Sequence, residues 1–204
     1  MNDLILFFKA DHNIRKISDG LFDQARIHDL KRSDLNNFSI QLLNLFSVFV
    51  PEHLAIAEHI TNVYDSMIDD EDKHSICTQR CAEDIKDIYE RKIAIDGFID
   101  RYNKALNEYE IAKTRYIKNK GADNEELYHA KAKEYLEILK KSLNELIEQK
   151  RKFATFVKGR LSHAFLNYGI TLGEYSQKQK ELNQKIVNLI KKEVLENPDF
   201  LFDK

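Results

Sequence analysis

Apolar side chains recur at helical spacing along most of the chain, and the longest such pattern runs from residue 85 to residue 190. Its first half repeats every seven residues, at Ile88, Ile95, Tyr102, Tyr109 and Tyr116. Its second half carries a similar stripe from Tyr128 to Leu189, after the polar segment 118–124, where Gly121 supplies a turn. The pattern predicts two long helices that fold back on each other and bury their stripes against further helices.

The remaining elements follow from the same spacing. We predict one helix over about residues 1–68 with breaks near Gly20 and Pro51, a second over 73–118 and a third over 124–196. The acidic residues 69–72 contain no apolar side chain and are expected to form a connector. Helices of about 45 and 70 residues would be on the order of 70 and 105 Å long.

These elements indicate an all-α fold class, with a single helical domain over residues 1–204. Three long helices joined by short connectors are expected to pack antiparallel as an elongated, curved coiled coil. A rod this thin leaves apolar surface along its length, which a second copy can cover, so we expect a dimer. The chain contains only two Pro and six Gly, too few for the many turns of a β-rich fold.

Charge is distributed unevenly, although the net charge is only −2. Residues 1–72 carry 6 basic and 13 acidic side chains, whereas residues 101–160 carry 15 basic and 9 acidic ones. The basic part suggests an acidic partner, although lysines on long helices also form ordinary solvated faces beside glutamates. The pI of about 6.4 and the lack of a recognised nucleic-acid-binding motif argue against nucleic acid as that partner.

The apolar runs of the chain are short. None approaches the roughly 20 residues that cross a bilayer, and the segment from Leu4 to Phe8 lacks the features of a signal peptide. We therefore expect a cytoplasmic protein, with Cys77 and Cys81 as free thiols. Leu4 to Phe8 either packs along the helices or inserts into a membrane as a wedge, and the scarcity of lysine and arginine around it favours packing.

Metal chemistry has two candidate motifs with the spacing Glu-x-x-His, Glu71 to His74 and Glu126 to His129. Di-iron helical bundles use two such pairs that point into the bundle centre, but both pairs here fall at predicted helix ends. His74, Cys77 and Cys81 share a helical face, yet no fourth zinc ligand is evident. No phosphate-binding loop or catalytic motif stands out, so we expect no metal, no cofactor and no enzymatic activity.

One stretch of the chain resembles a known family. The positions that carry the resemblance are Arg101, Tyr109, Ala112, Lys113, Lys118, Lys120, Leu139, Ser142, Glu145, Leu146, Arg151 and Phe156. Around them, residues 84–175 resemble the tip and third helix of BAR domains, most closely those of retromer-type sorting nexins. The resemblance implies a crescent dimer, formed with a second copy or a related BAR chain, that senses or scaffolds curved anionic phospholipid membranes. It also implies a peripheral location on endosomal or vesicle membranes during protein transport.

In that family, lysine and arginine clusters contact the membrane. By position, Lys113, Arg115, Lys118 and Lys120 match the tip cluster. The resemblance places five more on the flanking face: Lys104, Lys131, Lys133, Lys140 and Lys141. Each basic residue near a charged bilayer contributes only ~1 kcal/mol, and neighbouring glutamates cancel part of this, so many contacts must act together.

Two further expectations concern partners. Retromer-type sorting nexins carry a phosphoinositide-binding phox-homology domain before the rod. None is present in this sequence, so lipid specificity is expected from another chain, or is absent, unless the chain is a fragment. The alternative function is a coiled-coil adaptor that recruits a protein such as a small GTPase or a coat subunit without remodelling membrane.

Overall fold

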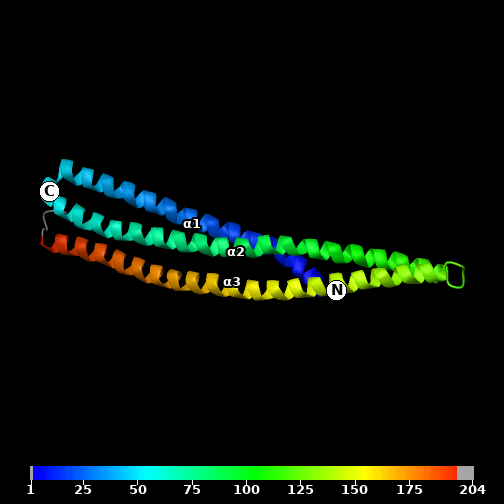
Figure 1. The fold of residues 1–204 in the computed structure, drawn as a ribbon. Helices are drawn as coiled ribbons and strands as arrows, with labels where there is room; N and C mark the ends of the chain where they lie inside the picture. The colour runs from blue at the N-terminus through cyan, green and yellow to red at the C-terminus, as the bar shows by residue number, and fades with distance from the viewer. Residues whose placement is uncertain (1, 197–204) are drawn as a thin grey trace. The chain divides into compact units, whose positions relative to one another are not determined.

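The computed structural model describes the backbone of residues 2–196 and, within that range, the side chains of all residues except 2–12 and Val194. Its elements are α1 (Asn2–Phe49), the short 3-10 helix η1 (Pro51–His53), α2 (Leu54–Lys118) and α3 (Glu125–Glu196) (Figure 1). Residues 2–196 contain no strand, so the predicted all-α class is confirmed. The side chains of Leu4 to Phe8, for which packing or membrane insertion is expected, lie outside this description.

The chain divides into two compact units. Unit 1 comprises residues 1–85 and 162–204, and unit 2 comprises residues 86–161. Unit 1 therefore contains α1, the beginning of α2 and the end of α3. Unit 2 is a hairpin made of the remaining parts of α2 and α3.

The helices of unit 1 pack antiparallel, and α1 lies beside the first part of α2 (Figure 1). Two contacts show that α1 and α2 run in opposite directions. The Ser18 hydroxyl donates to the Ala82 carbonyl (3.0 Å), whereas further along α1 the ring centre of Phe38 lies 5.5 Å from that of Tyr64, which precedes Ala82 in α2. The buried apolar residues of unit 1 are Ala25, Ile56, Ala57, Ile60, Met67, Cys81, Ala82, Ile85, Ala164 and Leu182. They occupy the inward stripes of all three helices.

A break is present near Pro51, but one helix over residues 1–68 is wrong, because α1 ends at Phe49 and the chain changes direction there before α2. The residue before a proline is pushed out of the helical region, and Val50 has φ −144° and ψ 60°. Pro51 cannot donate a backbone hydrogen bond, but it suits the first position of a new helix, where it opens η1. An apolar stripe that resumes in phase after a proline is compatible with either a kink or a reversal.

The expected connector at residues 69–72 lies inside α2, so this boundary is also wrong. Its carboxylates have partners on the other helices. Asp70 accepts a hydrogen bond from Gln179 of α3 (3.0 Å), and Asp72 pairs with Arg32 of α1. Because these partners hold the acidic side chains in place, four consecutive acids remain helical where local sequence favours an interruption.

The helices of unit 2 lie side by side up to the turn that joins them (Figure 1). The buried apolar residues of its seam are Ile88, Ile95, Ile99, Ala105, Ala112, Ala132, Leu146 and Phe153. The three alanines are the buried residues nearest the turn. Small side chains in a seam allow two helices to approach closely, which leaves their longer charged residues on the outside.

Two glycines predicted to interrupt helices behave differently. Gly20 lies inside α1 with open space around it, so the expected break is absent. Gly121 has φ 84° in the turn between α2 and α3, and its N–H donates to the Glu125 carboxylate (2.6 Å). A positive φ strains any residue with a Cβ, so glycine is required at this turn but not in α1.

Two alanine substitutions test this assignment. Gly121→Ala should lower the free energy of unfolding by about 1 kcal/mol, because alanine is strained at positive φ. Gly159→Ala, at an exposed and uncrowded position inside α3, should raise it by up to about 1 kcal/mol, because alanine has the higher helix propensity. Urea unfolding followed by circular dichroism measures both changes. A stabilising effect of Gly121→Ala would contradict the turn described above.

Candidate functional site

All nine basic residues predicted to contact membrane are exposed, and all nine belong to unit 2. They are Lys104, Lys113, Arg115, Lys118, Lys120, Lys131, Lys133, Lys140 and Lys141. Residues 86–161 carry 18 basic and 13 acidic side chains, a net charge of +5. Lys140 forms an exposed ion pair with Glu137 (2.8 Å), which offsets part of its charge. No helix within residues 2–196 has both the length and the apolar content needed to cross a membrane.

The hairpin divides the predicted cluster between two sides. Arg115 and Lys131 line one hollow of about 210 Å³. Lys113 and Lys133 line another of about 280 Å³. Residues two positions apart on a helix point about 200° apart, so the two hollows open on different sides of the hairpin. These residues do not form the single cluster expected from the sequence, and the two-residue spacing in each helix already indicates this separation.

The two sides differ in composition. Glu108 and Glu134 line the Arg115 hollow and offset its positive charge. The described residues that line the Lys113 hollow include no carboxylate; besides Lys113 and Lys133 they are Tyr109, Tyr116, Ile117, His129, Ala132 and Leu136. Ile117 is 60% exposed. This side therefore combines basic side chains with accessible apolar and aromatic ones, a composition typical of membrane-facing surfaces.

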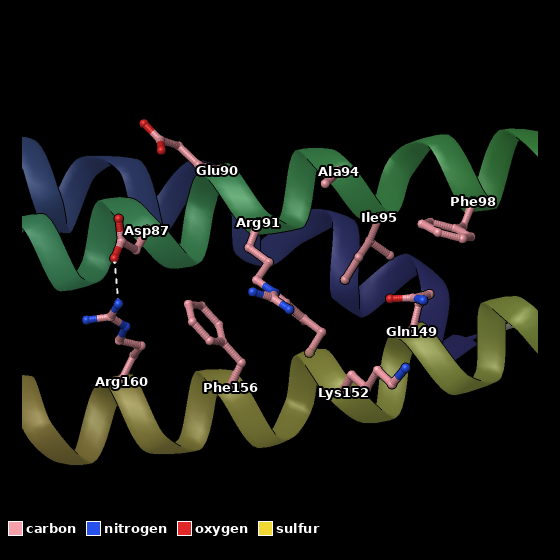
Figure 2. A pocket seen from close by; sticks show the side chains of 11 residues that line it. Asp87, Glu90, Arg91, Ala94, Ile95, Phe98, Gln149, Lys152, Phe156 and Arg160 are labelled. Atoms are coloured by element: carbon pink, nitrogen blue, oxygen red, sulfur yellow. Dashed lines mark ion pairs between the residues drawn. The ribbon is translucent and has the colours of Figure 1, made fainter.

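A larger groove of about 460 Å³ lies between α2 and α3 farther from the turn of unit 2 (Figure 2). Its walls include Ala94, Phe98 and Phe156. The guanidinium of Arg91 lies 4.8 Å from the centre of the Phe156 ring, and that of Arg160 lies 5.5 Å from it. Spacing within one helix does not reveal this groove, because its lining residues come from helix segments about 60 positions apart in the chain.

The centre of unit 1 contains a polar cluster contributed by all three helices. Glu71 of α2 is only 3% exposed. Its carboxylate accepts hydrogen bonds from the ring of His28 on α1 and from the hydroxyl of Tyr175 on α3, both at 2.5 Å. His74, one turn further along α2, stacks on the Tyr175 ring and meets the His28 ring edge-on, each with 4.5 Å between ring centres. One carboxylate therefore links three helices.

Burial controls the protonation of this cluster. It lowers the pKa of His74, and repulsion from His28 lowers it further, against the opposing effects of Glu71 and Asp70. His74 Nδ1 has no hydrogen-bond partner among the described residues. Burial also raises the pKa of Tyr175, and its hydrogen bond to Glu71 raises it further. The cluster thus favours a neutral His74 and a Tyr175 hydroxyl that remains a donor.

The position of Glu71 and His74 corrects the expectation that this pair lies at a helix end, since both are interior to α2. The apolar stripe of α2 passes through Met67 and continues to Glu71 and Thr78, so the register itself indicates that Glu71 points inward. Among the described side chains, no group of three or more His, Cys, Asp or Glu residues is arranged to hold a metal ion. The hydrogen bonds of Glu71 connect α2 with α1 and α3.

Unit 1 also has a hollow of about 530 Å³ between α2 and α3, which contains both cysteines. Cys77 and Cys81 are free thiols, and Cys77 Sγ lies 3.2 Å from the Thr171 hydroxyl. At the same hollow, His163 Nδ1 lies 2.8 Å from Asp84 Oδ2. Burial raises the pKa of the Cys81 thiol, which keeps it in the weakly nucleophilic protonated form.

The shared carboxylate can be tested by truncation. Glu71→Ala should lower the free energy of unfolding by about 3–5 kcal/mol, because it leaves the buried His28 ring and the half-buried Tyr175 hydroxyl without their acceptor. Tyr175→Phe removes one donor and should cost about 1–3 kcal/mol. Asp65→Ala is the matched control, since Asp65 is an exposed acid on the same helix, and it should change stability by less than about 0.5 kcal/mol. Equal urea-unfolding midpoints for Glu71→Ala and Asp65→Ala would refute this role.

Acid should weaken unit 1 through His74. Its pKa in the folded protein is below the ordinary value of 6.5, so the unfolded chain binds more protons as the pH falls below 6.5 and stability decreases. One such group contributes a slope of at most ~1.4 kcal/mol per pH unit. His74→Phe keeps an aromatic ring on Tyr175 but cannot titrate, so it should reduce the loss of stability between about pH 7.5 and about pH 5.5. An unchanged loss in urea unfolding would exclude His74 as its source.

Comparisons with known proteins add no assignment to this geometry. No protein-family model matches the chain, and no curated protein sequence matches it. The resemblance to BAR domains therefore remains a prediction, based on the residues of the tip and of α3 named above. The functional interpretation depends on the charge, burial and contacts of the described residues.

Proposed function

We propose that the protein is a peripheral membrane scaffold of the BAR type, which acts as a crescent dimer on curved anionic membranes in endosomal or vesicular trafficking. The observation that carries this proposal is the Lys113 side of unit 2. It combines lysines with the exposed Ile117 and half-buried tyrosines, and no carboxylate lines its hollow among the described residues. Anionic headgroups would pair with the lysines while Ile117 enters the boundary of the acyl chains.

The mechanism depends on many weak contacts. Lys113 and Lys133 are joined by Lys118 and Lys120 at the end of the hairpin, and each contributes about 1 kcal/mol near a charged bilayer. A dimer doubles the number of such contacts on one particle, so they act with high effective concentration. Contacts held on rigid helices engage simultaneously only when the membrane curvature matches their arrangement, which produces curvature sensitivity.

Exposed apolar side chains in unit 1 support the dimer. Large apolar residues remain uncovered on α1 and α3, among them Leu30, Phe38, Leu45, Leu166 and Ile170. Extensive apolar surface of this kind on a monomer usually marks a protein interface. A second copy, or a related chain with the same pattern, would cover it.

The alternative function is a coiled-coil adaptor that recruits a protein partner, such as a small GTPase or a coat subunit, without remodelling membrane. The same uncovered apolar residues of unit 1 favour it, since they would serve a different protein as well as a second copy. Vesicle binding separates the two functions. An adaptor would bind its partner but would not sediment with lipid.

Charge reversal on the two sides of the hairpin tests the membrane proposal. The double variant Lys113→Glu with Lys133→Glu should weaken binding to small phosphatidylserine-containing vesicles at low salt by at least about tenfold, because each contact contributes ~1 kcal/mol and reversal adds repulsion. The double variant Arg115→Glu with Lys131→Glu changes the net charge equally on the other side and should weaken binding less. Co-sedimentation measures both affinities.

Three outcomes of this experiment are informative. Preferential loss with the Lys113 and Lys133 variant supports membrane binding through that side. Equal loss with both variants would show that the overall charge acts without orientation. If the unaltered protein binds neither small nor large vesicles at any salt, the membrane function is wrong and the adaptor function is favoured.

A further inference from the structure

The groove of Figure 2 contains an arginine, Arg91, whose guanidinium can bind a carboxylate. Arg91 lies over the Phe156 ring and forms no ion pair with any of the described side chains. A guanidinium stacked on a ring keeps its planar N–H edge available for bidentate hydrogen bonds. The same groove already contains one such pairing, since Arg160 also lies over Phe156 and binds the Asp87 carboxylate at 2.9 Å.

The groove has the length and polarity to take a helix. Its α2 lining recurs every three or four residues from Asp87 to Phe98, so it follows one face of the helix for about 17 Å, or three turns. Asp87 and Arg160 lie at one end, Arg91 lies between the ends, and Phe98 lies at the other end, on the side of Gln149 and Lys152 (Figure 2). A small anion would use only part of this lining, whereas an amphipathic helix would fill the whole length.

This groove is a feature of unit 2 alone. All residues that line it belong to the two helices of unit 2, α2 and α3. Ile95 and Phe153 form its buried floor, and Phe98 and Phe156 are half-buried. Of the charged residues that line the groove, Arg91, Lys152 and Arg160 outnumber Asp87 and Glu90, and Arg160 is paired with Asp87, so the lining favours an acidic occupant over a basic one.

We propose that this groove binds an amphipathic helix of a partner protein that carries an acidic side chain and, two turns away, a leucine or aromatic side chain. Arg91 would bind the acidic side chain, and the apolar one would pack against Ala94 and Phe98. The spacing of the two partner side chains follows from Arg91 and Phe98, which are seven positions apart and therefore about 10 Å apart along α2. This site is separate from the proposed membrane contacts, since Arg91 is not one of the nine basic residues assigned to them.

Fluorescence polarisation with the full chain and short labelled helical peptides tests the proposal. The matched probe carries a glutamate and a leucine seven positions apart. Its permuted control has the same composition, with the two residues on opposite faces of the helix. The matched peptide should bind saturably and the permuted one at least about tenfold more weakly, because only the matched spacing reaches both ends of the groove.

Three protein variants identify the groove as the site. Arg91→Glu should weaken the matched peptide by at least about tenfold and should favour a peptide with lysine in place of the glutamate. Lys158→Glu makes the same change in charge on an exposed residue that does not line the groove, and it should change affinity less than about threefold. Ala94→Trp should block binding by filling the groove without changing the charge.

Circular dichroism of each variant establishes that it remains helical. Failure of the matched peptide to bind, or equal binding by the Arg91→Glu and Lys158→Glu variants, would overturn the proposal. If Arg91→Glu instead abolishes vesicle sedimentation while no peptide binds, the groove serves lipid and the partner-helix proposal is wrong. Loss of peptide binding with unchanged vesicle sedimentation would support this site independently of the membrane function.

Discussion

The hydrogen bonds of the Glu71 carboxylate hold unit 1 in one register. A carboxylate buried to this extent is costly unless donors satisfy it, and His28 from α1 and Tyr175 from α3 both do so. Apolar stripes alone would allow neighbouring helices to slide by a turn with little loss of contact. A slide of either helix would separate Glu71 from a donor, so the cluster selects one alignment of the three helices.

Unit 2 is held together in another way. Its seam consists mainly of apolar side chains that become small toward the turn, including Ala105, Ala112 and Ala132. Lys92 is also buried, and it pairs with Asp96 one turn along the same helix (3.3 Å). A polar cluster shared by three helices thus aligns unit 1, whereas the two helices of unit 2 meet mainly through apolar side chains.

The candidate contacts were only partly predictable. Long helices with charged outer faces make lysine exposure predictable, and all nine predicted residues are exposed. The separation of Arg115 and Lys131, whose hollow also contains glutamates, from Lys113 and Lys133 depends on how α2 and α3 are rotated against each other. The pairing of Arg91 with Phe156 depends on the same alignment, since the two residues are far apart in the chain. Helical spacing within one segment carries no information about which residue lies opposite on the next.

The sequence by itself determined the helical class, the two long apolar stripes and the turn at Gly121, because these follow from local periodicity and from the freedom of glycine at positive φ. Only the tertiary structure decided that residues 69–72 continue a helix and that the chain reverses at Pro51. A run of acids favours a solvated connector until side chains from other helices supply its partners. A proline ends a hydrogen-bond ladder, but long-range packing decides whether the next helix continues or turns back.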